Sequence, residues 1–273
     1  MSALSTACSL MVLVVLGATG CSKSSPETGP ETAPVAVASE WPEDIKWLRT
    51  ALRKRHPNIH AKVSEKELSA RFDSLARDAA KLSELEIGLR LMQIFAKIGD
   101  GHTQVRPQLK GTRALPLQLR GFKDGIFVVA TAPDARDLLG AKLTRVGETP
   151  IAVAIAKLTP YIVHENQPTL RMKVAGFLTS ASVLKSAGLI QDTGRVSLTF
   201  TVQGKARSMT MDTVAAEALR SVAWVRPSRK LALYEKQGAR AYWNDWLPKA
   251  KTLYFKYNRC AGREGFAKLV AVG

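Results

Sequence analysis

The chain has 273 residues, a hydrophobic fraction of 46% and a formal net charge of +17 at pH 7. Its length and apolar content suit a globular protein with an ordinary hydrophobic core, and its three cysteines exclude a disulfide framework as the source of stability. Basic residues are scattered among acidic ones without an aromatic-rich basic motif, so we expect no nucleic-acid partner.

The chain begins with a segment typical of export. Residues 10–16 form an unbroken apolar run, far shorter than the roughly 20 residues that span a bilayer, which predicts a signal peptide over residues 1–20. The sequence Ala18-Thr19-Gly20-Cys21 resembles a bacterial lipobox, in which Cys21 becomes the lipidated first residue. No Lys or Arg precedes the run, and Ala18 stands where Leu is usual, so an ordinary secretory signal is the alternative. We expect a lipoprotein of the bacterial cell envelope, anchored on the periplasmic side or at the cell surface.

A linker and a helical domain follow. Residues 21–40 mix Ser, Thr, Glu, Ala and Pro without an apolar period, which is typical of a flexible tether. Over residues 41–108, apolar positions recur at helical spacing and predict three helices. Pro42 suits the first turn of the first helix. Ser64 and Ser83 begin capping boxes, and Gly99 suits the end of the third helix.

Residues 109–215 read as a β-rich domain. Strands are predicted at 126–129, 143–146 and 196–202, with a short helix at 151–158. The last strand turns at Gln203-Gly204-Lys205 into a hairpin. Residues 216–273 start a third unit with a strand at 252–257, and residues 266–272 suit either a helix or a strand. The expected fold class is therefore α+β.

Several motifs occur in an order that resembles the amino-terminal region of tail-specific proteases, the group of C-terminal-processing, tricorn-core and retinoid-binding-protein-like serine peptidases. The motifs are Trp41-Pro42-Glu43-Asp44-Ile45, Arg55-His56-Pro57-Asn58, Ile98-Gly99-Asp100-Gly101-His102-Thr103, Asp137-Leu138-Leu139-Gly140-Ala141-Lys142-Leu143, Val146-Gly147, Thr149-Pro150-Ile151, His164-Glu165-Asn166 and Thr252-Leu253-Tyr254-Phe255-Lys256-Tyr257-Asn258-Arg259. The resemblance implies a PDZ-like domain over residues 109–215. It also implies that residues 216–273 open an incomplete α/β serine-peptidase core.

The resemblance assigns one catalytic candidate. In tricorn-like members a histidine of this front region is the general base, a role that falls on His102; other members use a lysine. A glycine-flanked histidine just past a helix end can be exposed and aimed at a cleft, with Asp100 and Thr103 as candidates to set its tautomer. The alternative is a turn whose histidine packs at a domain boundary. The family's Gly-Gly turn, serine nucleophile and following lysine or acid are absent from this sequence, so we expect a chain truncated before its nucleophile and inactive alone.

The second hypothesis is a membrane-tethered scaffold. PDZ-like domains bind peptide or protein C-termini as an added strand, although the usual Gly-Leu-Gly-Phe loop is not recognisable here. After Asp192 there are fifteen Lys or Arg against five Asp or Glu. For an exported protein this excess favours anionic lipid headgroups or wall polymers over nucleic acid, but we expect a solvated surface with no specific partner before either. No cofactor is expected.

Other reactive residue types carry no assignment. His56 and His60 have a spacing that can bind zinc on a helix, but Pro57 lies between them and no third ligand is evident, so we expect turn residues and no metal site. Ser182 and Lys185 form an S-x-x-K string without the motifs that accompany it in penicillin-binding enzymes. Ser208 and Ser221 lie in no nucleophile motif.

Overall fold

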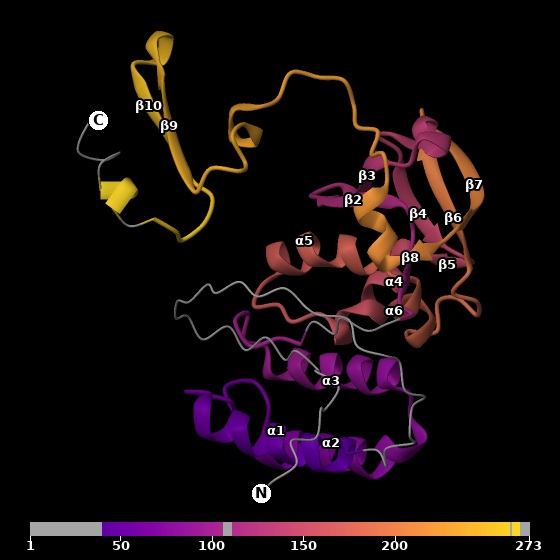
Figure 1. Ribbon diagram of the computed structural model, residues 1–273. Helices are drawn as coiled ribbons and strands as arrows, with labels where there is room; N and C mark the ends of the chain where they lie inside the picture. The colour runs from indigo at the N-terminus through magenta and orange to yellow at the C-terminus, as the bar shows by residue number, and fades with distance from the viewer. Residues whose placement is uncertain (1–39, 106–110, 263, 268–273) are drawn as a thin grey trace, which may run out of the picture. The chain divides into compact units, whose positions relative to one another are not determined.

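The structure is a computed structural model that describes residues 40–105, 111–262 and 264–267. The predicted signal peptide, Cys21 and the linker up to residue 39 lie outside the described residues. The chain divides into two compact units, Met1–Pro227 and Ser228–Gly273 (Figure 1). Helices and strands are mixed, which confirms the α+β class. In the part of the chain that the structure describes, no helix is long and apolar enough to cross a membrane.

Three helices open the first unit, as predicted. They are α1 (Trp41–Arg55), α2 (Glu65–Asp78) and α3 (Glu84–Ile98). The Ser83 hydroxyl accepts the Glu86 N–H while the Glu86 carboxylate accepts the Ser83 N–H, which is the predicted capping box of α3. At α2 only half of the predicted capping box forms: the Ser64 hydroxyl accepts the backbone N–H of Glu67. The Glu67 carboxylate accepts hydrogen bonds from Arg71 one turn later in α2.

The rest of the first unit is built on an antiparallel sheet with the strand order β2-β3-β4-β6-β7 and β5 paired to β4. Its strands are β2 (Leu117–Phe122), β3 (Gly125–Thr131), β4 (Lys142–Val146), β5 (Thr149–Pro150), β6 (Arg195–Val202) and β7 (Lys205–Asp212). A separate short pair joins β1 (Arg113–Ala114) to β8 (Val214–Ala215). The predicted hairpin turn is present, since Gln203 and Gly204 both have positive φ, at 48° and 79°.

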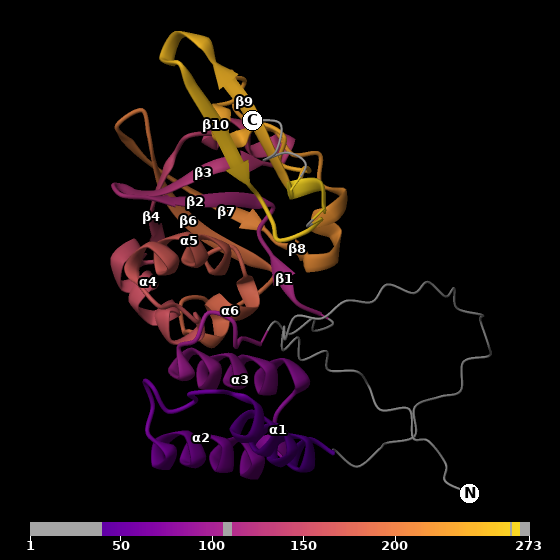
Figure 2. The ribbon, with the colours of Figure 1, turned by 90° about the vertical axis from the view of Figure 1, so that its left-hand side faces the viewer.

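Helices cover the sheet and connect it to the helical part. They are α4 (Ile151–Leu158), α5 (Gln167–Phe177) and α6 (Ala181–Ser186), with 3-10 turns at Ala79–Lys81, Pro133–Leu138, Thr159–Tyr161 and Ala216–Ser221. Helix α3 lies between the α1–α2 pair and helices α4–α6 (Figures 1 and 2). Its Leu91 belongs to a core formed by the first three helices, and its Leu89 belongs to the core under the sheet. Helix α3 therefore joins two hydrophobic cores, and Met92 packs against both.

Helix α5 lies close against the sheet at β2. A Cβ added to Gly121 of β2 would lie 2.2 Å from the backbone oxygen of Arg171 in α5. Only a residue without a side chain allows this approach, so Gly121 sets the distance between the helix and the strand.

The second unit is a two-stranded ribbon of β9 (Tyr242–Leu247) and β10 (Thr252–Tyr257), with 3-10 turns at Leu233–Glu235 and Pro248–Ala250. Trp243 is buried and contacts Tyr254, with ring centroids 5.3 Å apart. On the opposite face the large side chains are exposed, among them Trp246, Leu253, Phe255 and Tyr257. The strand predicted at 252–257 is confirmed. The predicted domain boundaries at 108/109 and 215/216 stay predictions.

Candidate functional site

The loop after α3 carries the residues of the candidate site. Gly99 ends the helix in the left-handed conformation, with φ of 69°, as its predicted role requires. The Lys62 ammonium donates to the Gly99 carbonyl at 2.9 Å. This contact satisfies a carbonyl at the negative end of the helix dipole and fixes the start of the loop.

Asp100 is the centre of a hydrogen-bond network. Its Oδ2 accepts the Thr103 hydroxyl at 2.6 Å, and its Oδ1 accepts the backbone N–H of His102 at 3.1 Å. The Thr103 hydroxyl, together with the His102 amide and His56, lowers the pKa of the Asp100 carboxyl below its ordinary value. The carboxylate is therefore ionised near neutral pH, and it fixes the backbone of the residues that follow it.

His56 reaches the same carboxylate from the end of α1. Its Nε2 lies 3.1 Å from Asp100 Oδ2, and its Nδ1 accepts the backbone N–H of Asn58 at 3.1 Å. The second contact requires a lone pair on Nδ1, so the ring proton of a neutral His56 lies on Nε2 and points at Asp100. The His56 side chain is 8% exposed. His56 and His60 do not act together, because the His60 ring lies against the carbonyl of Val63.

Glu165 approaches from the segment that precedes α5. Its Oε1 accepts the N–H of Gly101 at 2.9 Å. A Cβ on Gly101 would lie 2.8 Å from the same oxygen, so the absence of a side chain there permits the contact. The next residue, Asn166, caps α5 by accepting the N–H of Thr169, which fixes the chain beside Glu165.

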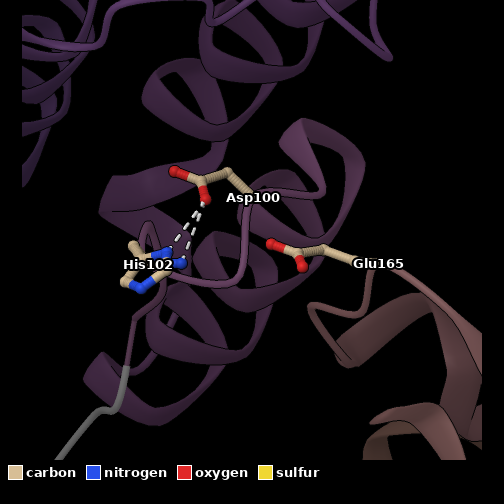
Figure 3. A group of neighbouring side chains, drawn as sticks. All are labelled: Asp100, His102 and Glu165. Carbon is tan, nitrogen blue, oxygen red and sulfur yellow. Dashed lines mark hydrogen bonds and ion pairs between the residues drawn. The ribbon is translucent and has the colours of Figure 1, made fainter. Parts of the chain in front are cut away.

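His102 stands on this loop with its side chain 91% exposed. Its Nδ1 lies 3.7 Å from Asp100 Oδ1, close enough for charge attraction and too far for a hydrogen bond. The Thr103 hydroxyl donates to Asp100. Asp100 thus holds the backbone of His102, and Thr103 holds the Asp100 carboxylate. Figure 3 shows Asp100 and His102 facing one another while the Glu165 carboxylate reaches toward them.

The remaining sequence candidates lie elsewhere. Ser182 is buried, and its hydroxyl accepts the N–H of Arg113 at 3.2 Å. Ser208 shares a hydrogen bond with Thr199 across the β6–β7 hairpin, and Ser221 is exposed at the end of a 3-10 turn. None of the three is hydrogen-bonded to a histidine among the described residues.

Sequence reasoning missed the roles of His56 and Glu165 at this site. Both belong to the motifs that carry the family resemblance, at positions 55–58 and 164–166. Their place in these motifs was the only indication in the sequence that His56 and Glu165 belong to the site. Their contacts with the loop at 99–103 join residues 44 and 64 positions apart.

Two of the hollows in the first unit lie beside α5. One, of about 510 Å³, is lined mainly by apolar residues of α3, α5 and the segment at 161–163, together with Ser182. The other, of about 460 Å³, lies between the start of β2 and the end of α5, beside Leu219, Arg220 and Trp224. His102 lines neither of them.

Comparison with known proteins finds similarity at the level of the fold. No protein-family model matches the chain, and no curated protein matches it. A structure of mature CPAF complexed with lactacystin matches 73% of this chain and 40% of the CPAF chain, with a TM-score of 0.50 and 17% sequence identity. A crystal structure of a CPAF mutant matches 64% of this chain and 34% of that chain, with a TM-score of 0.48 and 16% identity.

CPAF is a serine protease similar to the tail-specific group. The similarity to mature CPAF supports a protease-like fold for the matched part of this chain. The chain spans less than half the length of the CPAF chains that it matches.

Proposed function

We propose that this chain forms the amino-terminal part of an exported serine-type peptidase, with His102 as the general base and a nucleophile carried by another segment. The observation that carries the proposal is the similarity of its fold to a serine protease over 73% of its residues. The ordered sequence motifs resembling tail-specific proteases support the same assignment independently of the fold.

The geometry suits a general base that acts on a serine hydroxyl carried by another segment. The exposed ring of His102 leaves space for a serine hydroxyl to approach to within about 2.6–3.2 Å, the distance that proton transfer needs. His102 would take the hydroxyl proton as the oxygen attacks the peptide carbonyl, and would then give it to the leaving amine. The Asp100 carboxylate, 3.7 Å from the ring, stabilises the imidazolium formed in between. Oxyanion donors must come with the nucleophile.

The proposal includes inactivity of this chain alone, because none of its 273 residues forms a recognisable nucleophile turn. The purified mature chain, residues 21–273, is incubated with a library of fluorescence-quenched peptides bearing free C-termini. We expect no turnover above buffer. Cleavage that disappears after treatment with a serine-reactive phosphonate would show a nucleophile within the chain and overturn this part of the proposal.

We also propose lipid attachment at Cys21, which places the folded units in the bacterial cell envelope. The apolar run at 10–16 and the lipobox-like residues 18–21 support it. Several acyl chains on one residue give stable anchoring, since each buried methylene contributes about 0.8 kcal/mol. Metabolic labelling with radioactive palmitate should mark the wild-type chain and not Cys21→Ala. Equal labelling of both chains would exclude attachment at Cys21.

A second candidate function is binding of peptide C-termini, as in a tethered scaffold. The hollow of about 460 Å³ favours this function. It is lined by residues of the edge strand β2 and by the exposed Arg220. An edge strand can accept a peptide as a further strand, and a guanidinium suits its terminal carboxylate. Peptides with apolar free C-termini should bind, and amidation or Arg220→Ala should weaken them. Equal affinity for free and amidated peptides would exclude this mode.

A further inference from the structure

Asp100, His102 and Glu165 bring three metal-binding groups together at the surface of the first unit. One donor atom from each, two carboxylate oxygens and an imidazole nitrogen, lies within 4.8 Å of the other two. The imidazole distinguishes this group from an ordinary acidic patch, because a histidine nitrogen is a ligand that zinc prefers. We propose that these three residues form a binding site for a divalent transition-metal ion, with Zn²⁺ as its ligand.

One separation in the group is close to that of a zinc site, and the donor atoms all lie within 4.8 Å of one another. Zinc lies about 2.0–2.2 Å from nitrogen and oxygen ligands in tetrahedral geometry, so two ligand atoms are separated by about 3.3–3.5 Å. His102 Nδ1 and Asp100 Oδ1 are 3.7 Å apart, near that separation. Glu165 and His102 are both exposed, so their side chains can close the wider gaps by small rotations.

Contacts outside the trio hold its carboxylates in place. His56 and Thr103 engage Oδ2 of Asp100, and the backbone N–H of His102 donates to Oδ1, which holds Oδ1 beside the His102 ring. The Gly101 N–H holds Oε1 of Glu165 beside the loop. Hydrogen bonds of this kind orient the ligands of protein metal sites and tune their affinity. His56 is almost completely buried, so the orienting group is itself fixed by packing.

The charge of the group suits a cation. The two carboxylates contribute a charge of −2, on a chain whose formal net charge is +17. A divalent ion would neutralise the two carboxylates. Three protein ligands leave a fourth position for water, because the His102 side of the group is open to solvent.

Zinc at this position would regulate the site. A zinc ion bound to Nδ1 of His102 leaves the ring proton on Nε2, so the ring has no free lone pair with which to accept the proton of a hydroxyl. Metal binding and general-base action by His102 therefore exclude one another. The binding site itself does not depend on the proposed peptidase function, and its test needs no activity.

The test is calorimetric titration of the metal-free chain with Zn²⁺ at neutral pH. We expect one ion per chain, and an affinity reduced about tenfold or more by His102→Ala and by Glu165→Gln. His60→Ala, which also removes an exposed histidine, and Cys260→Ser, which removes the exposed thiol, are the controls and should leave the affinity unchanged. Both ligand residues are exposed, so unchanged melting temperatures will show that the variants fold.

Three results would overturn the proposal. They are an absence of saturable Zn²⁺ binding, an affinity that His102→Ala leaves unchanged, and binding lost only in Cys260→Ser. A site that prefers Mg²⁺ or Ca²⁺ to Zn²⁺ would overturn the assignment of the metal, since those ions select oxygen ligands alone.

Discussion

His56 and Asp100, 44 residues apart in the chain, share a 3.1 Å contact that fastens the end of α1 to the loop after α3. The same histidine accepts the N–H of Asn58, so one ring holds two backbone segments in place. The loop that presents His102 is therefore positioned by a residue outside it.

Replacing His56 should destabilise the first unit. His56→Leu leaves the Asp100 carboxylate without one donor and the Asn58 N–H without its acceptor, which costs about 1–3 kcal/mol. His56→Gln, which retains an N–H donor, should cost less. His60→Leu is the matched control, because His60 is exposed, and should change the unfolding free energy by less than about 0.5 kcal/mol. Urea unfolding measures all three, and equal effects of His56→Leu and His60→Leu would contradict the role given to this contact.

The capping box of α3 predicts a pH-dependent contribution to stability. Hydrogen bonds from the Ser83 N–H and hydroxyl lower the pKa of Glu86 below its ordinary value of 4.5. A lowered folded-state pKa gives stability that is complete above the unfolded pKa and is lost as pH falls through the folded pKa. Glu86→Gln should therefore be less stable than wild type at pH 7, by about 0.3–1 kcal/mol for an exposed helix-end charge.

The difference between wild type and Glu86→Gln should shrink as the pH falls below about 4.5, which denaturant titrations at several pH values will measure. A difference that stays constant down to pH 3 would mean that the charge of Glu86 does not contribute.

Two glycines near α5 should respond oppositely to alanine. Gly121→Ala places a methyl group 2.2 Å from the Arg171 backbone oxygen, so α5 must shift, at a cost of about 1–3 kcal/mol. Gly176→Ala meets no atom within 4 Å and lies inside α5, so it should be neutral or stabilise by up to about 1 kcal/mol. Thermal unfolding of both variants tests this, and a stable Gly121→Ala protein would mean that α5 does not pack as described.

The exposed ribbon of the second unit should open more readily than the sheet of the first. A two-stranded ribbon is marginal in water, and one face of β9–β10 exposes Trp246, Leu253, Phe255 and Tyr257. Backbone amides of β9 and β10 should therefore exchange with deuterium at least about tenfold faster than those of β3, β4 and β6. Equal protection in mass-spectrometric exchange would show that the exposed face is covered in solution.

Local signals in the sequence predicted much of the helical part and the hairpin. Ser83 and Glu86 mark the start of α3, Gly99 marks its end, and Gln203-Gly204 marks a turn, because each of these residues acts on neighbours within four positions. Helix α5 was not predicted, since its apolar residues form no clear stripe. The residue that best indicated the start of this helix was Asn166, which caps α5 in the structure.

The site itself required the tertiary structure. The contacts of Asp100 with His56 and of Gly101 with Glu165 join segments that no local pattern connects. The sequence placed His102 past a helix end and predicted its exposure. Asp100 holds His102 through a 3.1 Å hydrogen bond to its backbone N–H and lies 3.7 Å from its ring, and only the fold determines these two distances.

The central claim is that His102 of this chain serves a serine supplied by another segment. Its most direct test is to translate the DNA beyond codon 273 in all frames, co-express any product that carries the Gly-Gly turn and serine, and measure cleavage of peptides with free C-termini. We expect the pair to cleave, and the His102→Ala pair to lose at least about a hundredfold in rate, the usual contribution of a general base. Equal cleavage with His102→Ala, or no frame that encodes such a product, would contradict the claim.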